Sequence, residues 1–126
     1  MVRTRNVEIK DTIYSSTRDV EILVWDAQKV DGDTVSLMLN GEFILENHPL
    51  TKLPKRIKAT LKSDSNSIVL YAHNLGTIPP NTASISILHQ NNQQEVSLMS
   101  DKKNSQAVIV IHDVFETVSP VDEENK

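Results

Sequence analysis

Hydrophobic side chains recur at every second position along most of this chain, in short runs separated by polar turns. A period of two is typical of β-strands, whereas α-helices repeat apolar residues at intervals of three and four. The pattern therefore predicts nine short strands and no helix of useful length. The predicted strands are Val7 to Tyr14, Val20 to Trp25, Thr34 to Leu39, Glu42 to Glu46, Arg56 to Leu61, Ser67 to His73, Ala83 to Leu88, Glu95 to Met99 and Ala107 to Ile111.

The segments between these strands carry strong turn signals. Asn40-Gly41 lies between two apolar runs, and this dipeptide is the strongest short-range indication of a tight hairpin. Polar loops at Gln90 to Gln93 and Asp101 to Asn104 predict two further hairpins. The segment Asn74 to Thr82 contains two consecutive prolines, which remove two amide donors, so we expect an irregular connection there.

Two of the predicted strands, Val20 to Trp25 and Ser67 to His73, are apolar on both faces, which is typical of strands in the middle of packed sheets. Arg56 to Leu61 alternates apolar with basic and polar residues, as a half-exposed edge strand does. The sequence therefore predicts an all-β fold, an antiparallel β-sandwich of the immunoglobulin or jelly-roll kind. A small closed β-barrel is the alternative, because nine strands could also wrap into a ring.

The chain of 126 residues is long enough for one domain with a single core. We assign residues 1–113 to this domain and residues 114–126 to an acidic tail or linker, because the strand pattern is lost from Asp113 onward. The 13 basic and 17 acidic residues give a net charge of −4, and the basic residues are scattered. This distribution argues against nucleic acid as a partner, since phosphate binding needs clustered lysine and arginine.

The chain contains no cysteine, which excludes disulfides, thiolate metal sites and a cysteine nucleophile. No window approaches the roughly 18 apolar residues of a membrane-spanning helix. The first five residues, MVRTR, lead directly into polar sequence and do not have the form of a signal peptide. If the protein is exported, we expect its export signal to be missing from this sequence.

A loop rich in carboxylates is the best candidate for a chemical site. Asp26, Asp31 and Asp33 lie within eight residues around Gly32, and Asn74 could complete a shell of oxygen ligands. Hard cations such as Ca²⁺ prefer several carboxylate oxygens from a bent loop, so calcium is the expected metal. The D-x4-D-G-D spacing is not that of an EF-hand. Alternatively, Asp26 ends a strand and the other aspartates form side-chain-to-backbone turns, which are far commoner than metal loops.

The single tryptophan, Trp25, invites a second hypothesis, because an exposed indole is a stacking platform for sugars. Aromatic residues make up only 4% of the chain, so we expect Trp25 to pack in the core. Carbohydrate binding would require Trp25 or Tyr71 to be exposed beside polar groups. The four histidines lie far apart, and no G-x-S-x-G, H-E-x-x-H or glycine-rich phosphate loop is present, so we expect no catalytic site.

Two longer stretches resemble a module that recurs in secreted and envelope-associated proteins of Bacteroidota and related bacteria. They are VWDAQKVDGDTVSLMLNGEFIL and LYAHNLGTIPPNTASISI, which follow the patterns W-D-x4-D-G-D-x-V-x-L-x2-N-G and N-L-G-x-I-P-P-N-T-A. After Asp26, where an Asn-Gly pair is expected in this module, the chain has Ala27-Gln28. The resemblance implies an extracytoplasmic β-sandwich accessory domain, whether secreted, periplasmic or at the cell surface.

The expected function is therefore that of a non-catalytic interaction or scaffold module of an exported or cell-surface bacterial protein. Its partner would be a protein or a polysaccharide, with or without a calcium ion that stabilises the loop from Asp26 to Asp33. A carbohydrate-binding module is the alternative, and a small hydrolase is the least supported of the three.

Overall fold

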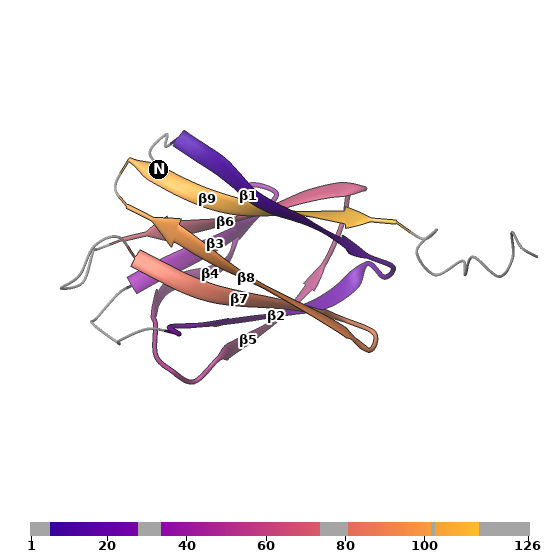
Figure 1. Ribbon diagram of the computed structural model, residues 1–126, viewed down its shortest axis with the longest axis horizontal. Coiled ribbons are helices and arrows are strands. Elements are labelled where there is room, and N and C mark those ends of the chain that lie inside the picture. The colour runs from indigo at the N-terminus through magenta and orange to yellow at the C-terminus, as the bar shows by residue number, and fades with distance from the viewer. Residues whose placement is uncertain (1–5, 28–33, 74–80, 102, 114–126) are drawn as a thin grey trace, which may run out of the picture.

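The computed structural model describes residues 6–27, 34–73, 81–101 and 103–113. This part of the chain contains nine strands and no helix, and it confirms the all-β prediction (Figure 1). All nine predicted strands are present and differ from the prediction only at their ends. They are β1 (Asn6–Ser15), β2 (Asp19–Trp25), β3 (Thr34–Leu39), β4 (Glu42–Pro49), β5 (Lys55–Thr60), β6 (Ser65–Ala72), β7 (Asn81–His89), β8 (Asn92–Ser100) and β9 (Asn104–His112).

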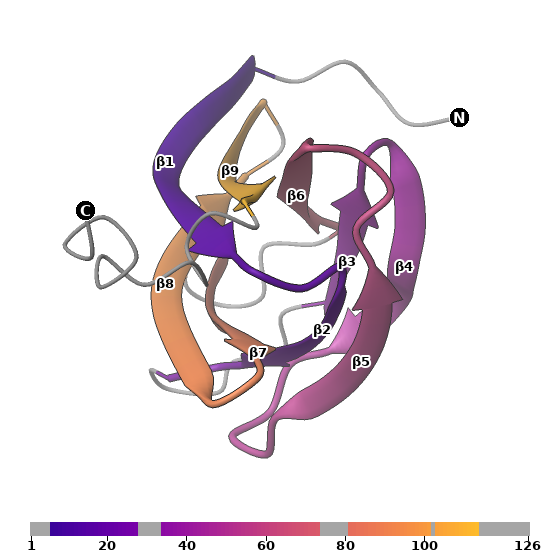
Figure 2. The ribbon, with the colours of Figure 1, turned by 90° about the vertical axis from the view of Figure 1, so that its right-hand side faces the viewer.

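The strands form one hydrogen-bonded sheet in the order β4-β3-β6-β9-β8-β7-β2-β5, with β1 added along β9. The sheet curls until its end strands, β4 and β5, contact each other, so it is nearly closed like a small barrel (Figure 2). The join between β8 and β9 is narrow, because it consists of the pair Ser100 and Ser105. Two halves, β4-β3-β6-β9-β1 and β8-β7-β2-β5, therefore enclose one core.

One pair of strands is parallel, which is an exception to the predicted antiparallel arrangement. Strand β1 runs beside β9 from the pair Asn6 and Asn104 to the pair Ser15 and His112. An irregularity between Ile9 and Asp11 interrupts the register. A strand has the same period of two whether its neighbour is parallel or antiparallel, so the local pattern carries no information on this pairing.

The predicted Asn40-Gly41 hairpin is confirmed. Asn40 has φ 53° and Gly41 has φ 85°, and two positive φ values are what the tight type I′ turn between twisted strands requires. The β7–β8 hairpin is tighter than predicted, since His89 already pairs with Asn92 and leaves two residues in the loop. Its first loop residue, Gln90, also has a positive φ, 53°.

The core is built by alternation from both halves of the sheet. It includes Val20, Ile22 and Val24 of β2 and Ile68 and Leu70 of β6. Complete burial of such side chains stabilises a fold by about 1.5–3 kcal/mol each. Strands β2 and β6 are central in their halves and β5 ends the sheet, as predicted.

The prediction that Trp25 belongs to the core is wrong. Trp25 is half-buried and lies outside the core cluster. Because Ile22 and Val24 point inward, the period of two directs Leu23 and Trp25 to the outer face. The scarcity of aromatic residues could not predict the outward direction of Trp25, because the position of a residue in the alternation along its strand decides which face its side chain takes.

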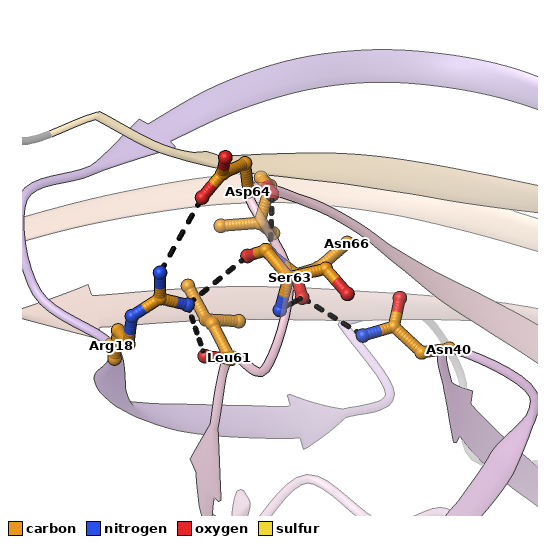
Figure 3. Close-up of polar contacts among 7 residues, drawn as sticks. Arg18, Asn40, Leu61, Ser63, Asp64 and Asn66 are labelled. Atoms are coloured by element: carbon orange, nitrogen blue, oxygen red, sulfur yellow. Dashed lines mark hydrogen bonds and ion pairs between the residues drawn. The ribbon is translucent and has the colours of Figure 1, made fainter.

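A buried asparagine, Asn66, joins three segments at one end of the sheet (Figure 3). Its Oδ1 accepts hydrogen bonds from Asn40 Nδ2 at 2.8 Å and from the backbone N–H of Ser63 at 3.2 Å. Its Nδ2 donates to the carbonyl oxygens of Ser63 at 2.8 Å and Val110 at 3.1 Å. These four bonds satisfy both the donors and the acceptor of the amide, as burial of a polar group requires.

Arg18 fixes the same turn from outside (Figure 3). Its guanidinium donates to the carbonyl oxygen of Leu61 at 2.9 Å and pairs with the Asp64 carboxylate at 3.4 Å. The backbone N–H of Leu61 donates in return to the carbonyl oxygen of Arg18 at 2.7 Å. The backbone contacts anchor the turn, because an ion pair as exposed as this one contributes little to stability.

Candidate functional site

The predicted cation site lies mostly outside the described residues, which include Asp26 but neither Asp31, Asp33 nor Asn74. Asp26 follows β2 and is buried, and its backbone N–H donates to the carbonyl oxygen of Thr51 at 2.8 Å. Within the described ranges, no group of three or more histidine, aspartate or glutamate side chains could hold a metal ion. The calcium site therefore stays a prediction, with one of its four residues placed.

A row of apolar side chains crosses all five strands of the β4-β3-β6-β9-β1 half. Phe43 pairs with Met38, and Met38 pairs with Val69. Val69 pairs with Ala107, and Ala107 pairs with Ile9. Residues that lie directly opposite each other on paired strands share one face of the sheet. The five side chains therefore form a continuous line from one edge of this half to the other.

This row lies on the outer face of the sheet. Its neighbours along the strands, Leu39, Ile68 and Val108, belong to the core cluster, so alternation points the row away from the core. Ile9 is 51% exposed and Phe43 is 37% exposed at the two edges. In the centre of the row Met38 and Val69 are half-buried, and Ala107 is fully buried.

A second group extends the row along β9 and β1. Ile109 and Ile111 alternate with the core residues Val108 and Val110, and both are half-buried. Tyr14, which is 44% exposed, pairs with Ile111. We call this combined surface the apolar face; its residues are Ile9, Tyr14, Met38, Phe43, Val69, Ala107, Ile109 and Ile111.

The charges of the described residues set the two halves apart. Strands β3, β6 and β9, which form the centre of the apolar face, contain no aspartate, glutamate, lysine or arginine. The outer face of the other half is charged: Glu21 pairs with Lys58 in the register, and Arg56 forms an ion pair with Glu21. The lack of charged residues in three neighbouring strands distinguishes the centre of this half from the charged pairs of β2 and β5.

The sequence contains an indication of the apolar face in the strand Ser67 to His73. The apolar residues on both sides of Ser67 to His73 predicted a buried central strand, and β6 is central. One side of β6 faces the core, but the other, with Val69, faces outward. The absence of charge from three neighbouring strands would have identified the apolar face, had the strand order been known.

A serine hydroxyl and a histidine ring form a close contact that the sequence did not indicate. Ser36 Oγ lies 2.5 Å from His73 Nε2, and the same hydroxyl accepts a hydrogen bond of 3.0 Å from the backbone N–H of Asn47. Ser36 is buried, and Asn47 has φ 50° where the β3–β4 register is irregular. The contact therefore stabilises this irregular pairing.

No helix with the length and hydropathy needed to cross a bilayer occurs in the described part of the chain. Comparison of the chain with family models, with curated proteins and with solved structures gives no match. The resemblance to the Bacteroidota module therefore stays a prediction, and the functional argument rests on the geometry of the surface.

Proposed function

We propose that this chain is a non-catalytic interaction module that binds a protein partner through the apolar face. The observation that carries the proposal is the row from Phe43 through Met38, Val69 and Ala107 to Ile9. Contiguous apolar surface on a folded domain is costly in water, at about 25 cal/mol for each Å². Exposed apolar side chains that lie together on a folded domain are typical of interaction sites, and Ile9, Tyr14 and Phe43 of this face are exposed.

The composition of the face favours a protein over a polysaccharide. The hydroxyl groups of a sugar need hydrogen-bonding side chains, and the row offers side chains such as Ile9, Phe43 and Met38 instead. Its edges carry Phe43 and Tyr14, and aromatic residues are enriched in protein interfaces. The expected partner therefore presents an uncharged, apolar surface. An extracytoplasmic location is part of the proposal and rests on the resemblance described above.

Site-specific photocrosslinking tests where the partner lies. A photoreactive phenylalanine derivative replaces Ile9 or Phe43, and Leu53 provides the matched control because it is 80% exposed and lies outside the apolar face. We expect one defined protein to crosslink from positions 9 and 43 and not from position 53, and the purified partner to bind the unmodified chain. Equal crosslinking from all three positions would contradict the proposal. Sedimentation velocity on the chain alone checks for a second copy as the occupant, which would also contradict it.

A further inference from the structure

A buried histidine lacks any hydrogen-bond partner among the described residues. His89 occupies the next inward position of β7 after the core residues Ile85 and Ile87, and it is 4% exposed. Neither Nδ1 nor Nε2 of its ring is hydrogen-bonded within the described ranges. A buried polar group without a hydrogen-bond partner destabilises the folded state, which is why such groups are rare outside functional sites.

His89 lines a surface cavity of about 260 Å³. The cavity lies where the end of β1 meets the β7–β8 hairpin, and Figure 1 shows both at the same end of the molecule. The residues that line it are Tyr14, His89, Asn92, Gln93 and Gln94. Two segments far apart in the sequence thus build one small hollow around the unpartnered ring.

The lining residues select the chemistry of a ligand. None of them is aspartate, glutamate, lysine or arginine, so the cavity offers neither carboxylates for a metal cation nor a fixed positive charge for an anion. Asn92, Gln93 and Gln94 carry amides, each of which both donates and accepts hydrogen bonds. One of these amides is held in place, because Gln93 Nε2 donates to Ser86 Oγ at 2.8 Å.

We infer that this cavity binds one neutral sugar unit, free or at the end of a glycan chain. A sugar hydroxyl both donates and accepts, so it suits the amides and supplies the partner that the His89 ring lacks. Tyr14 lines the same cavity and is 44% exposed, so its phenol group is within reach of a bound sugar. The volume is below the range of about 300–1,000 Å³ that holds drug-sized ligands, which limits the occupant to about one ring.

The cavity shares Tyr14 with the apolar face, but the inference does not rest on the proposed protein partner. His89 faces the inside of the sheet and is not part of the apolar face, so a variant at His89 leaves that face intact. The alternative of a carbohydrate-binding module required Trp25 or Tyr71 to be exposed, and both are half-buried. The cavity at His89 lies elsewhere and places the exposed Tyr14 beside polar side chains. The sequence alone did not show that these residues are neighbours.

Titration of the labelled protein with a panel of neutral monosaccharides, followed by NMR, tests the inference. We expect at least one sugar to shift the ring resonances of His89 and Tyr14. The dissociation constant should rise at least tenfold in His89→Leu and in Tyr14→Ala, and Trp25→Ala should retain the affinity of the unmodified chain. His89→Leu should fold, because it replaces a buried polar group that has no partner with an apolar one.

A glycan array distinguishes the two sources of the sugar. Binding to glycans with one shared terminal unit, but to no free sugar, would assign the cavity to chain ends. Binding to free sugars as well would assign it to the unit itself. A blank array together with unshifted His89 and Tyr14 resonances would overturn the inference. So would sugar binding that Trp25→Ala abolishes and His89→Leu leaves unchanged.

Discussion

The side-chain amide of Asn40 donates a hydrogen bond of 2.8 Å to the side-chain oxygen of Asn66, 26 positions further along the chain. Asn40 Oδ1 in turn accepts a bond of 2.9 Å from the backbone N–H of Ser67. Asn40 therefore has two roles: its positive φ forms the hairpin, and its side chain ties that hairpin to the start of β6.

Replacement of Asn66 should weaken the fold strongly. Asn66→Ala removes four hydrogen bonds and leaves the carbonyl oxygen of Val110 and the amide of Asn40 without these partners, so we expect the free energy of unfolding to fall by about 3 kcal/mol. Asn91→Ala in the exposed β7–β8 turn is the control, with an expected change within about 0.5 kcal/mol. Denaturant unfolding measures both. A loss of less than about 1 kcal/mol for Asn66→Ala would show that the network is dispensable.

One substitution made on two strands tests the outward direction of the apolar face. Val108→Ala removes methyl groups from the core and should cost about 2–3 kcal/mol of unfolding free energy. Val69→Ala makes the same change on the outer face and should cost about 1 kcal/mol or less. Equal losses at the two positions would mean that Val69 is as buried in the folded chain as Val108.

The pH dependence of stability should include a contribution from His48. Burial, and secondarily the charge of Lys55, lower the pKa of His48 below its ordinary value of 6.5 in the folded state. The folded chain therefore favours neutral His48. This contribution to the stability of the fold is fully present above pH 6.5, and it is lost as the pH falls from 6.5 through the lowered pKa. Melting temperatures across this range should fall less steeply in His48→Gln, whose side chain does not titrate.

Lys55→Met separates the two causes. NMR titration should show the pKa of His48 rising in this variant but staying below 6.5, because burial is the larger cause. A pKa that returned fully to 6.5 would assign the shift to the lysine alone. If the melting temperature depends on pH in the same way in the unmodified chain and in His48→Gln, His48 does not contribute to the pH dependence of stability.

Calcium decides between the two predictions for the carboxylate loop. A cation bound by Asp26, Asp31, Asp33 and Asn74 at a hundred times its dissociation constant should add about 2.7 kcal/mol to stability. The melting temperature would then rise in millimolar calcium, and Asp31→Asn and Asp33→Asn would each remove the rise. The alternative, ordinary turns, predicts equal melting temperatures with calcium, with a chelator and in both variants.

The sequence was sufficient for the strands because their signal is local. The alternation in Val20 to Trp25 and the Asn40-Gly41 dipeptide each depend on a few neighbouring residues, and both predictions are confirmed. The parallel pairing of β1 with β9 joins segments almost a hundred residues apart, for which a single strand holds no information.

The candidate sites depended on the same long-range arrangement. The apolar face appears only when β4, β3, β6, β9 and β1 are placed side by side, and the sugar cavity only when Tyr14 meets the hairpin of His89. The sequence pointed instead to Asp31 and Asp33, because closely spaced carboxylates are visible without any knowledge of the fold.

The affinity of the purified partner for two matched variants tests the central claim most directly. Ile9→Lys combined with Phe43→Lys places two charges on the apolar face, whereas Leu53→Lys places one on an exposed position outside it. Each lysine would put an unpaired charge against the apolar surface of the partner, and desolvation of an unpaired charge is costly, so we expect the double variant to bind at least tenfold more weakly. Both variants should keep the melting temperature of the unmodified chain within a few degrees. If the double variant binds as tightly as Leu53→Lys, the apolar face is not the docking surface.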